Sequence, residues 1–159
     1  FLNEDKCYSE DSIFNFEFLC KAEGAITIND ALYNYNIENE NSICNNYNKR
    51  YNYLNNWKEQ LISIARENDI DIEKLEKKIN KMYLDCTIVS IKQEILATNN
   101  SFIDKRKKIV EILKQPNIIN MLADNENFSG KSKNKKIMLY MMKYKFVNLI
   151  YILVKLRRK

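Results

Sequence analysis

Only two glycines and one proline occur among the 159 residues of this chain. These residues form most tight turns and interrupt helices, and a fold with many loops or many short strands needs more of them. We therefore predict long helices joined by few turns, in a chain long enough to bury a hydrophobic core of its own. The sequence begins at Phe1 and shows no signal peptide, so we expect it to be part of a longer protein.

The first predicted helix begins after Ser9, a favourable N-cap residue, and has Glu10 and Asp11 in its first turn. Acidic side chains are stabilised there by the unpaired N–H groups and the helix dipole. The residues from Ile13 to Leu19 make the helix apolar over most of its circumference, which predicts burial on more than one side. Glu23-Gly24 should end it.

Two short strands are predicted after this helix. Ala25 to Ile28 is a β-branched run, Asn29-Asp30 is typical of a turn, and Leu32 to Ile37 alternates tyrosine with polar residues. Together with the helices, these strands give a predicted α+β fold that is mostly α.

The order of these pieces resembles the second half of a family 2 glycosyltransferase of the GT-A type. Members of that family commonly carry a Glu-Asp pair, an aromatic helix with a Lys-Ala-like end, an Ile-rich strand, a Leu-Tyr-x-Tyr strand and an Asn-Ser-Ile segment. The matching residues here are Glu10-Asp11, Lys21-Ala22, Ala25 to Ile28, Leu32 to Tyr35 and Asn41-Ser42-Ile43. The resemblance covers residues 1–50, and it implies that residues 1–46 are the end of a GT-A catalytic domain.

The resemblance implies that Asp11 is the general base of an inverting transfer from a nucleotide-sugar to a hydroxyl of a cell-surface glycan or lipid-linked acceptor. Glu10 would help to bind that acceptor. A carboxylate suits the task because the chain contains no histidine, the commonest general base. The alternative is that an acidic pair in a first helical turn serves only the helix.

Tyr33 and Tyr35 are the other predicted acceptor-binding residues. Alternation along a strand places them on one face, where their rings could stack on sugar rings. The alternative is that both rings belong to the core of a half-buried sheet.

The sequence departs from the family pattern in two respects. No arginine precedes Ser42 in the loop after the second strand. The nucleotide-binding half, with its Asp-x-Asp metal motif, is absent, so we expect the divalent ion (Mn or Mg) of the full-length enzyme to have its ligands outside this chain. We expect the isolated chain to be inactive.

Residues 47–123 are predicted to form a helical extension. Two apolar stripes predict an antiparallel helical hairpin with its break at Asn68-Asp69, with one longer coiled coil as the alternative. The first stripe is Leu54, Trp57, Leu61 and Ile64, and the second is Ile72, Leu75, Ile79, Met82, Cys86 and Val89. Ser101-x-x-Asp104 resembles a capping box, and Pro116 should mark the start of a short helix. Residues 124–136 are polar and are predicted to be a linker.

The last residues, 137–159, are predicted to form a basic amphipathic helix, running from about Ile137 to Leu156. Ten of the 26 basic residues lie from Lys131 to Lys159, where there is no acidic residue, so residues 1–130 carry 16 basic and 21 acidic groups. Such a helix can lie on an anionic membrane, or it can pack on the protein body with its lysines in water. The predicted membrane contacts are Lys143, Lys145, Phe146, Arg157 and Arg158.

The four cysteines lie apart from one another, without the spacing of a zinc site, and Cys20 and Cys86 are predicted to be reduced core residues. We therefore expect a cytoplasmic protein, peripheral at the inner face of the plasma membrane. Two rival functions remain: a helical protein-interaction module and a nucleic-acid-binding module. No nucleic-acid partner is expected, because the body is acidic and no recognised binding motif occurs.

Overall fold

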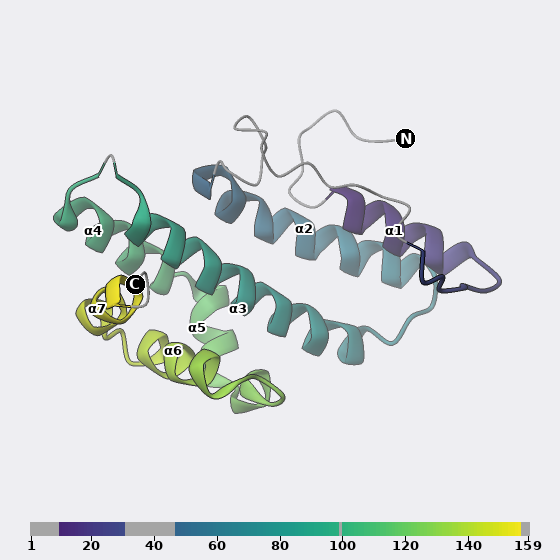
Figure 1. Ribbon diagram of the computed structural model, residues 1–159. Coiled ribbons are helices and arrows are strands. Elements are labelled where there is room, and N and C mark those ends of the chain that lie inside the picture. Colours follow the sequence, from purple (N-terminus) through teal and green to yellow (C-terminus); the bar gives the residue numbers. More distant parts are fainter. Residues whose placement is uncertain (1–9, 31–46, 99, 157–159) are drawn as a thin grey trace. The chain divides into compact units, whose positions relative to one another are not determined.

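The regular structure of this chain is helical wherever the computed structural model describes it, in residues 10–30, 47–98 and 100–156 (Figure 1). The elements are α1 (Glu10–Lys21), α2 (Tyr47–Glu67), α3 (Ile72–Leu96), α4 (Phe102–Leu113), α5 (Pro116–Ala123), the 3₁₀ helix η2 (Asn125–Phe128), α6 (Lys133–Lys143) and α7 (Val147–Leu156).

The predicted α+β fold is wrong for this part of the chain, because the described residues contain no strand. Ala25 to Ile28 is irregular, and Ile26 is 93% exposed. A strand needs a neighbouring strand to satisfy its backbone N–H and C=O groups. The described residues supply none, so β-branched composition alone does not make this segment a strand. The second predicted strand, Leu32 to Ile37, lies outside the described residues.

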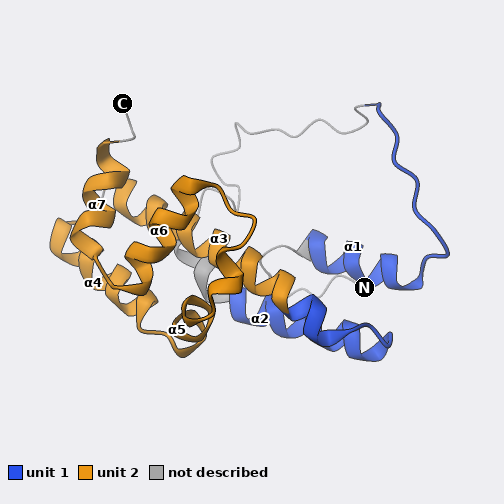
Figure 2. Cartoon of the chain, turned by 90° about the horizontal axis from the view of Figure 1, so that it is seen from below, with its two compact units in different colours: residues 1–76 blue, residues 77–159 orange. Residues whose placement is uncertain are grey.

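The chain divides into two compact units, residues 1–76 and 77–159 (Figure 2). In the first unit α1 packs on α2. The indole Nε1 of Trp57 on α2 donates a hydrogen bond of 2.8 Å to the hydroxyl of Ser12 on α1. Burial of α1 on several sides was a wrong prediction, since Phe14, Phe18 and Leu19 are each more than half exposed.

The break predicted at Asn68-Asp69 is confirmed. Asp69 has a φ of 53°, in the left-handed region that aspartate tolerates better than most residues. The backbone N–H of Ile70 then donates to the carbonyl of Ala65 at 3.0 Å, which closes the end of α2. Since α2 and most of α3 belong to different units, their antiparallel pairing stays a prediction.

The second unit contains α3 from Lys77 onward and α4 to α7 around a shared apolar core. Its most deeply buried side chains are Ile79, Tyr83, Leu84, Ile91, Ile95, Ile109, Leu113, Ile118, Leu139, Met142 and Ile150. Helix α6 packs on α5 and α7, and α4 packs on α5 and α7. The rings of Phe102 on α4 and Tyr151 on α7 meet edge to face, with centroids 4.8 Å apart.

The starts of α4 and α5 follow the predicted signals. Ser101 is the N-cap of α4, and its hydroxyl accepts a hydrogen bond from the backbone N–H of Asp104 at 3.2 Å. Pro116 opens α5, where its missing N–H costs nothing. Residues 124–136, predicted as a linker, contain η2 and the first turn of α6, and Asn127 and Phe128 are buried.

The single C-terminal helix predicted from Ile137 to Leu156 is wrong, because α6 and α7 are separate helices. Lys145 lies between them with a φ of 56°. The backbone N–H of Phe146 donates to the carbonyl of Met141 at 2.8 Å, and that of Lys145 donates to Met142 at 3.0 Å. This pair of hydrogen bonds is a Schellman motif, which ends a helix and redirects the chain.

Candidate functional site

Asp11 is the only predicted catalytic or acceptor-binding residue whose side chain the structure describes. It lies exposed in the first turn of α1, and its Oδ1 accepts a hydrogen bond of 2.9 Å from the backbone N–H of Ser12. Glu10 begins α1, but its side chain is outside the described part. Tyr33 and Tyr35 lie outside the described residues, so the predicted acceptor site is seen only at Asp11.

The first turn of α1 is anchored through the residue after Asp11. The Ser12 hydroxyl bonds the indole of Trp57, which is only 3% exposed. Because Trp57 belongs to the buried side of α2, this bond ties the position of Asp11 to the interior of the first unit. Sequence reasoning missed Trp57 as a site residue, since it lies 45 positions from Ser12.

Helix α7 in the second unit is apolar on two sides. Val147, Ile150 and Val154 are buried in the unit. A second row, which we call the apolar stripe, consists of Phe146, Leu149, Ile152 and Leu156, whose exposed fractions lie between 49% and 67%. A helix of a soluble globular protein normally turns polar residues to the solvent side. The apolar stripe is therefore a candidate contact surface.

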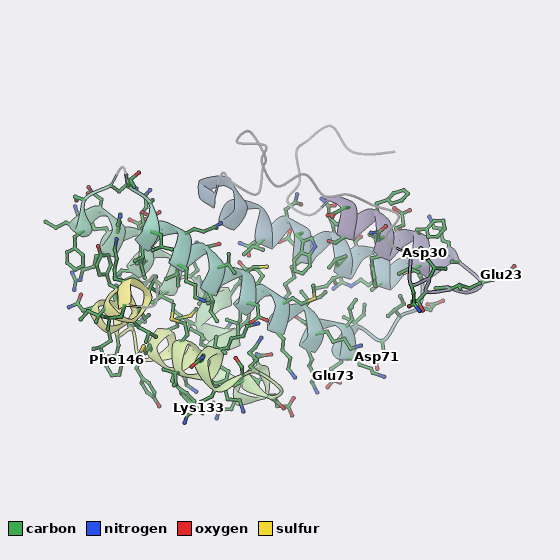
Figure 3. The ribbon with its side chains drawn as sticks, viewed as in Figure 1. Glu23, Asp30, Asp71, Glu73, Lys133 and Phe146 are labelled. Carbon is green, nitrogen blue, oxygen red and sulfur yellow. The ribbon has the colours of Figure 1, made fainter. Side chains whose placement is uncertain are left out.

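Lysines surround the apolar stripe. Lys145 is exposed at the corner between α6 and α7, where the rings of Tyr144 and Phe146 lie 6.0 Å apart. The ammonium nitrogen of Lys155 lies 5.8 Å from the centre of the Tyr151 ring. In Figure 3 the side chains of Lys133 and Phe146 point outward on the side of the second unit away from α3. The segment from Lys131 onward contributes only positively charged side chains to this surface, because it contains no acidic residue.

Lys143, a predicted membrane contact, bonds to the body of the second unit. Its ammonium donates to the carbonyl of Ala123 at 3.3 Å and to the Asn125 side-chain oxygen at 3.0 Å. It also lies 5.8 Å from the centre of the Phe128 ring. Lys145 and Phe146 are exposed as a surface contact requires, and Arg157 and Arg158 lie outside the described residues.

Within the described residues, no helix is both long enough and apolar enough to span a membrane.

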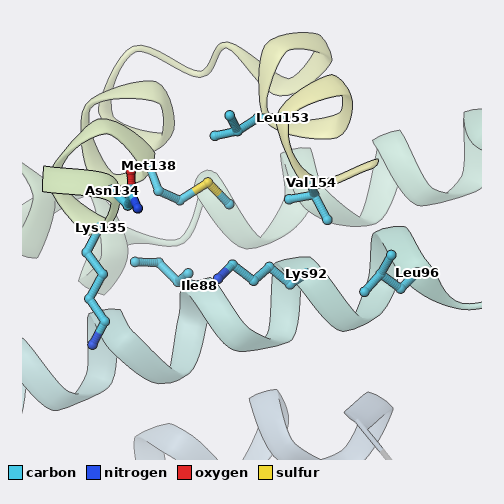
Figure 4. Close-up of a pocket in the computed structure, with 8 residues that line it drawn as sticks. All are labelled: Ile88, Lys92, Leu96, Asn134, Lys135, Met138, Leu153 and Val154. Atoms are coloured by element: carbon cyan, nitrogen blue, oxygen red, sulfur yellow. The ribbon is translucent and has the colours of Figure 1, made fainter. Parts of the chain in front are cut away.

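A groove of about 220 Å³ lies between α3, α6 and α7 in the second unit (Figure 4). Its apolar walls come from all three helices, and two lysines and one asparagine lie among them. The lining residues are Ile88, Lys92, Leu96, Asn134, Lys135, Met138, Leu153 and Val154. No periodicity within one helix could have predicted this groove, because three separate helices build it.

The described part of the chain has no group of three or more His, Cys, Asp or Glu side chains that could hold a metal ion. The divalent ion expected in the full-length enzyme therefore has no ligand set among these residues, and it stays a prediction. Cys20 and Cys86 are free and half-buried, and Cys7 and Cys44 lie outside the described residues.

No protein-family model, curated protein or solved structure matches this chain.

Proposed function

We propose that this chain is the acceptor-side part of an inverting family 2 glycosyltransferase, and that its second unit lies on the cytoplasmic face of an anionic membrane. The acceptor would be a cell-surface glycan or a lipid-linked glycan. Asp11 would take the proton of the acceptor hydroxyl while that oxygen bonds to the anomeric carbon, and the nucleoside diphosphate would leave from the opposite side. The nucleotide-binding half and its divalent ion would come from outside this chain.

The exposure of Asp11 in the first turn of α1 supports its proposed role. A general base must reach the hydroxyl that it deprotonates, and the Asp11 residue is exposed while the bond between Ser12 and Trp57 holds its turn in place. The exposed rings of Phe14 and Phe18 add to this support. They suit a helix that another layer of a longer enzyme covers.

The observation that carries the membrane part of the proposal is the apolar stripe of α7. Full burial of a Phe, Leu or Ile side chain contributes about 1.5–3 kcal/mol, so covering four half-exposed side chains would contribute roughly 3–6 kcal/mol. Each nearby lysine would add about 1 kcal/mol at an anionic surface. These magnitudes favour reversible, peripheral binding. A lipid-linked acceptor would then meet the enzyme at the surface where that acceptor is anchored.

Co-sedimentation with vesicles tests the membrane part. The chain should bind vesicles of phosphatidylglycerol and phosphatidylcholine, bind pure phosphatidylcholine much less, and lose binding as salt rises. Replacing Leu149 and Ile152 together by serine should remove most of this binding. A matched control replaces Met82 and Ile119, which are exposed apolar residues outside the apolar stripe. If the Leu149 and Ile152 variant binds anionic vesicles as well as the control variant does, the membrane assignment is overturned and a helical protein-interaction module is favoured.

Nucleotide release tests the enzymatic part. The full-length enzyme, extended upstream of Phe1, should release nucleotide from one member of a panel of nucleotide-sugars when Mn or Mg and an acceptor are present. No release with any donor, from a folded enzyme supplied with acceptor, would overturn the glycosyltransferase proposal. That outcome would not affect the membrane part of the proposal, which the vesicle experiment tests separately.

A further inference from the structure

We infer that the groove between α3, α6 and α7 takes one acyl chain of an anionic phospholipid, whose phosphate binds the ammonium of Lys92. This inference rests on the proposed association of the second unit with a membrane, and it names a lipid class that would bind there. Binding through an interfacial helix requires only a membrane surface and selects no particular lipid molecule. A groove beside that helix can bind a single lipid molecule.

The size and walls of the groove suit a segment of an alkyl chain. Its volume is about 220 Å³, and Ile88, Leu96, Met138, Leu153 and Val154 make most of its wall apolar. An apolar cavity of about 150 Å³ is already large enough to admit benzene. Met138 adds adaptability, because an unbranched thioether side chain adjusts to irregular neighbours at low cost.

The charge at the groove suits an anion. Figure 4 shows Lys92 running along α3 beside Ile88, at the lower wall of the groove. Lys92 is exposed, and it forms no hydrogen bond or ion pair with the residues that the structure describes. Lys135 is already engaged by Asp85 at 3.1 Å. None of the described lining residues is acidic, so Lys92 is the cation left to bind a phosphate.

The groove is continuous with the apolar stripe. Leu153, which lines the groove, lies four positions after Leu149 and three before Leu156, so the three share one side of α7. Leu149 and Leu156 are exposed members of the apolar stripe. The apolar side of α7 thus connects the apolar stripe with the wall of the groove, which offers an acyl chain a route between them.

Methyl NMR of methionine with a monomeric lipid tests the inference. Dihexanoyl phosphatidylglycerol, kept below its critical micelle concentration, should shift the Met138 methyl signal saturably. The Met121 methyl, buried in α5 and outside the groove, should not move. Dihexanoyl phosphatidylcholine and inorganic phosphate serve as comparison ligands. An unmoved Met138 signal, an equal response to the zwitterionic lipid, or equally tight binding of phosphate alone would overturn the inference.

A lysine pair provides the matched variants. Lys92→Gln should weaken binding of the anionic short-chain lipid about tenfold, the size of one charge-assisted contact. Lys107→Gln removes an exposed lysine of α4 outside the groove and should leave the affinity unchanged. Unchanged affinity in Lys92→Gln would overturn the assignment of the phosphate site.

The two proposals fail separately. The Leu149 and Ile152 double variant should lose vesicle binding and keep the Met138 response to monomeric lipid. If the unaltered chain ignores vesicles but Met138 still responds, the membrane proposal falls and the groove assignment stands. If vesicles bind and Met138 never responds, the groove assignment falls alone.

Discussion

The ammonium of Lys131 lies 2.8 Å from Oδ1 of Asp85, and this pair fixes the start of α6 to α3 inside the second unit. The Lys131 side chain is only 7% exposed, and it also donates to the carbonyl of Lys81 at 3.0 Å. Lys135 binds the second oxygen of the same carboxylate at 3.1 Å. One aspartate thus holds two lysines of the region that carries the basic surface.

Asp85→Asn should therefore destabilise the second unit more than a surface substitution does. The asparagine oxygen can still accept a hydrogen bond, but the nearly buried ammonium of Lys131 loses its negative partner, so the free energy of unfolding should fall by about 1–3 kcal/mol. Urea denaturation followed by circular dichroism measures this change. Lys135→Gln, at the exposed end of the network, should cost less than about 1 kcal/mol. An equal loss of unfolding free energy in Asp85→Asn and Lys135→Gln would show that the nearly buried Lys131 does not depend on the charge of Asp85.

Ser12→Ala should loosen the first turn of α1 from α2. Trp57 is the only tryptophan of the chain, so its fluorescence reports directly on this contact. Losing the hydroxyl leaves the buried indole N–H without that acceptor, which should shift the emission and lower stability by about 1–3 kcal/mol. Asn15→Ala, an exposed position of the same helix, is the control. An unchanged emission spectrum in Ser12→Ala would show that the contact does not hold α1 in solution.

In the proposed full-length glycosyltransferase, Asp11→Asn should leave the fold intact and remove nearly all transfer. A positioned general base contributes about 10²- to 10⁴-fold to rate, and the amide cannot accept the proton. The measurement is nucleotide release at saturating donor and acceptor, with Asp30→Asn, an exposed aspartate, as the matched control. Near-normal turnover of Asp11→Asn would remove Asp11 from the mechanism.

Glu17 and Lys21 should show a small, salt-sensitive pH effect in α1. The Lys21 ammonium donates a 2.7 Å hydrogen bond to Glu17, and this bond and its positive charge lower the pKa of the Glu17 carboxyl. A lowered pKa in the folded state stabilises α1 above the pKa of the unfolded chain, and this contribution is lost as pH falls through the folded value. Carboxyl-carbon NMR should give a midpoint below the ordinary glutamate value. Lys21→Ala or high salt should raise it, and a midpoint insensitive to both would refute the pairing.

Helices were predictable here where a local signal existed. The Ser101 cap, Pro116 and the Asn68-Asp69 break all act within a few residues of themselves, so the sequence around them was sufficient. The strand predicted at Ala25 to Ile28 failed because strand formation depends on a partner that local composition does not reveal.

The break between α6 and α7 was missed because its left-handed residue is Lys145, where a helix end is more commonly marked by glycine. The buried side of α3 was also misplaced in part: the predicted stripe included Met82 and Val89, which are exposed, and left out Tyr83, which is fully buried. In a helix so rich in apolar residues, several faces show apolar residues at helical spacing. The packing of the other helices then determines which of these faces is buried.

The candidate functional residues also differ in whether local sequence could predict them. Asp11 could be proposed from its neighbours along the chain. The groove could not, because Lys92, Met138 and Leu153 come from three helices and are brought together only by the packing of α3, α6 and α7.

Lys145 sets a limit on how stable the corner between α6 and α7 can be. A side chain in the left-handed region costs roughly 1–2 kcal/mol that glycine would avoid. Glycine there would strengthen the turn and also delete the exposed cation between Tyr144 and Phe146 in the sequence. Stability and charge therefore oppose each other at this corner, because the residue that would best stabilise the turn carries no charge.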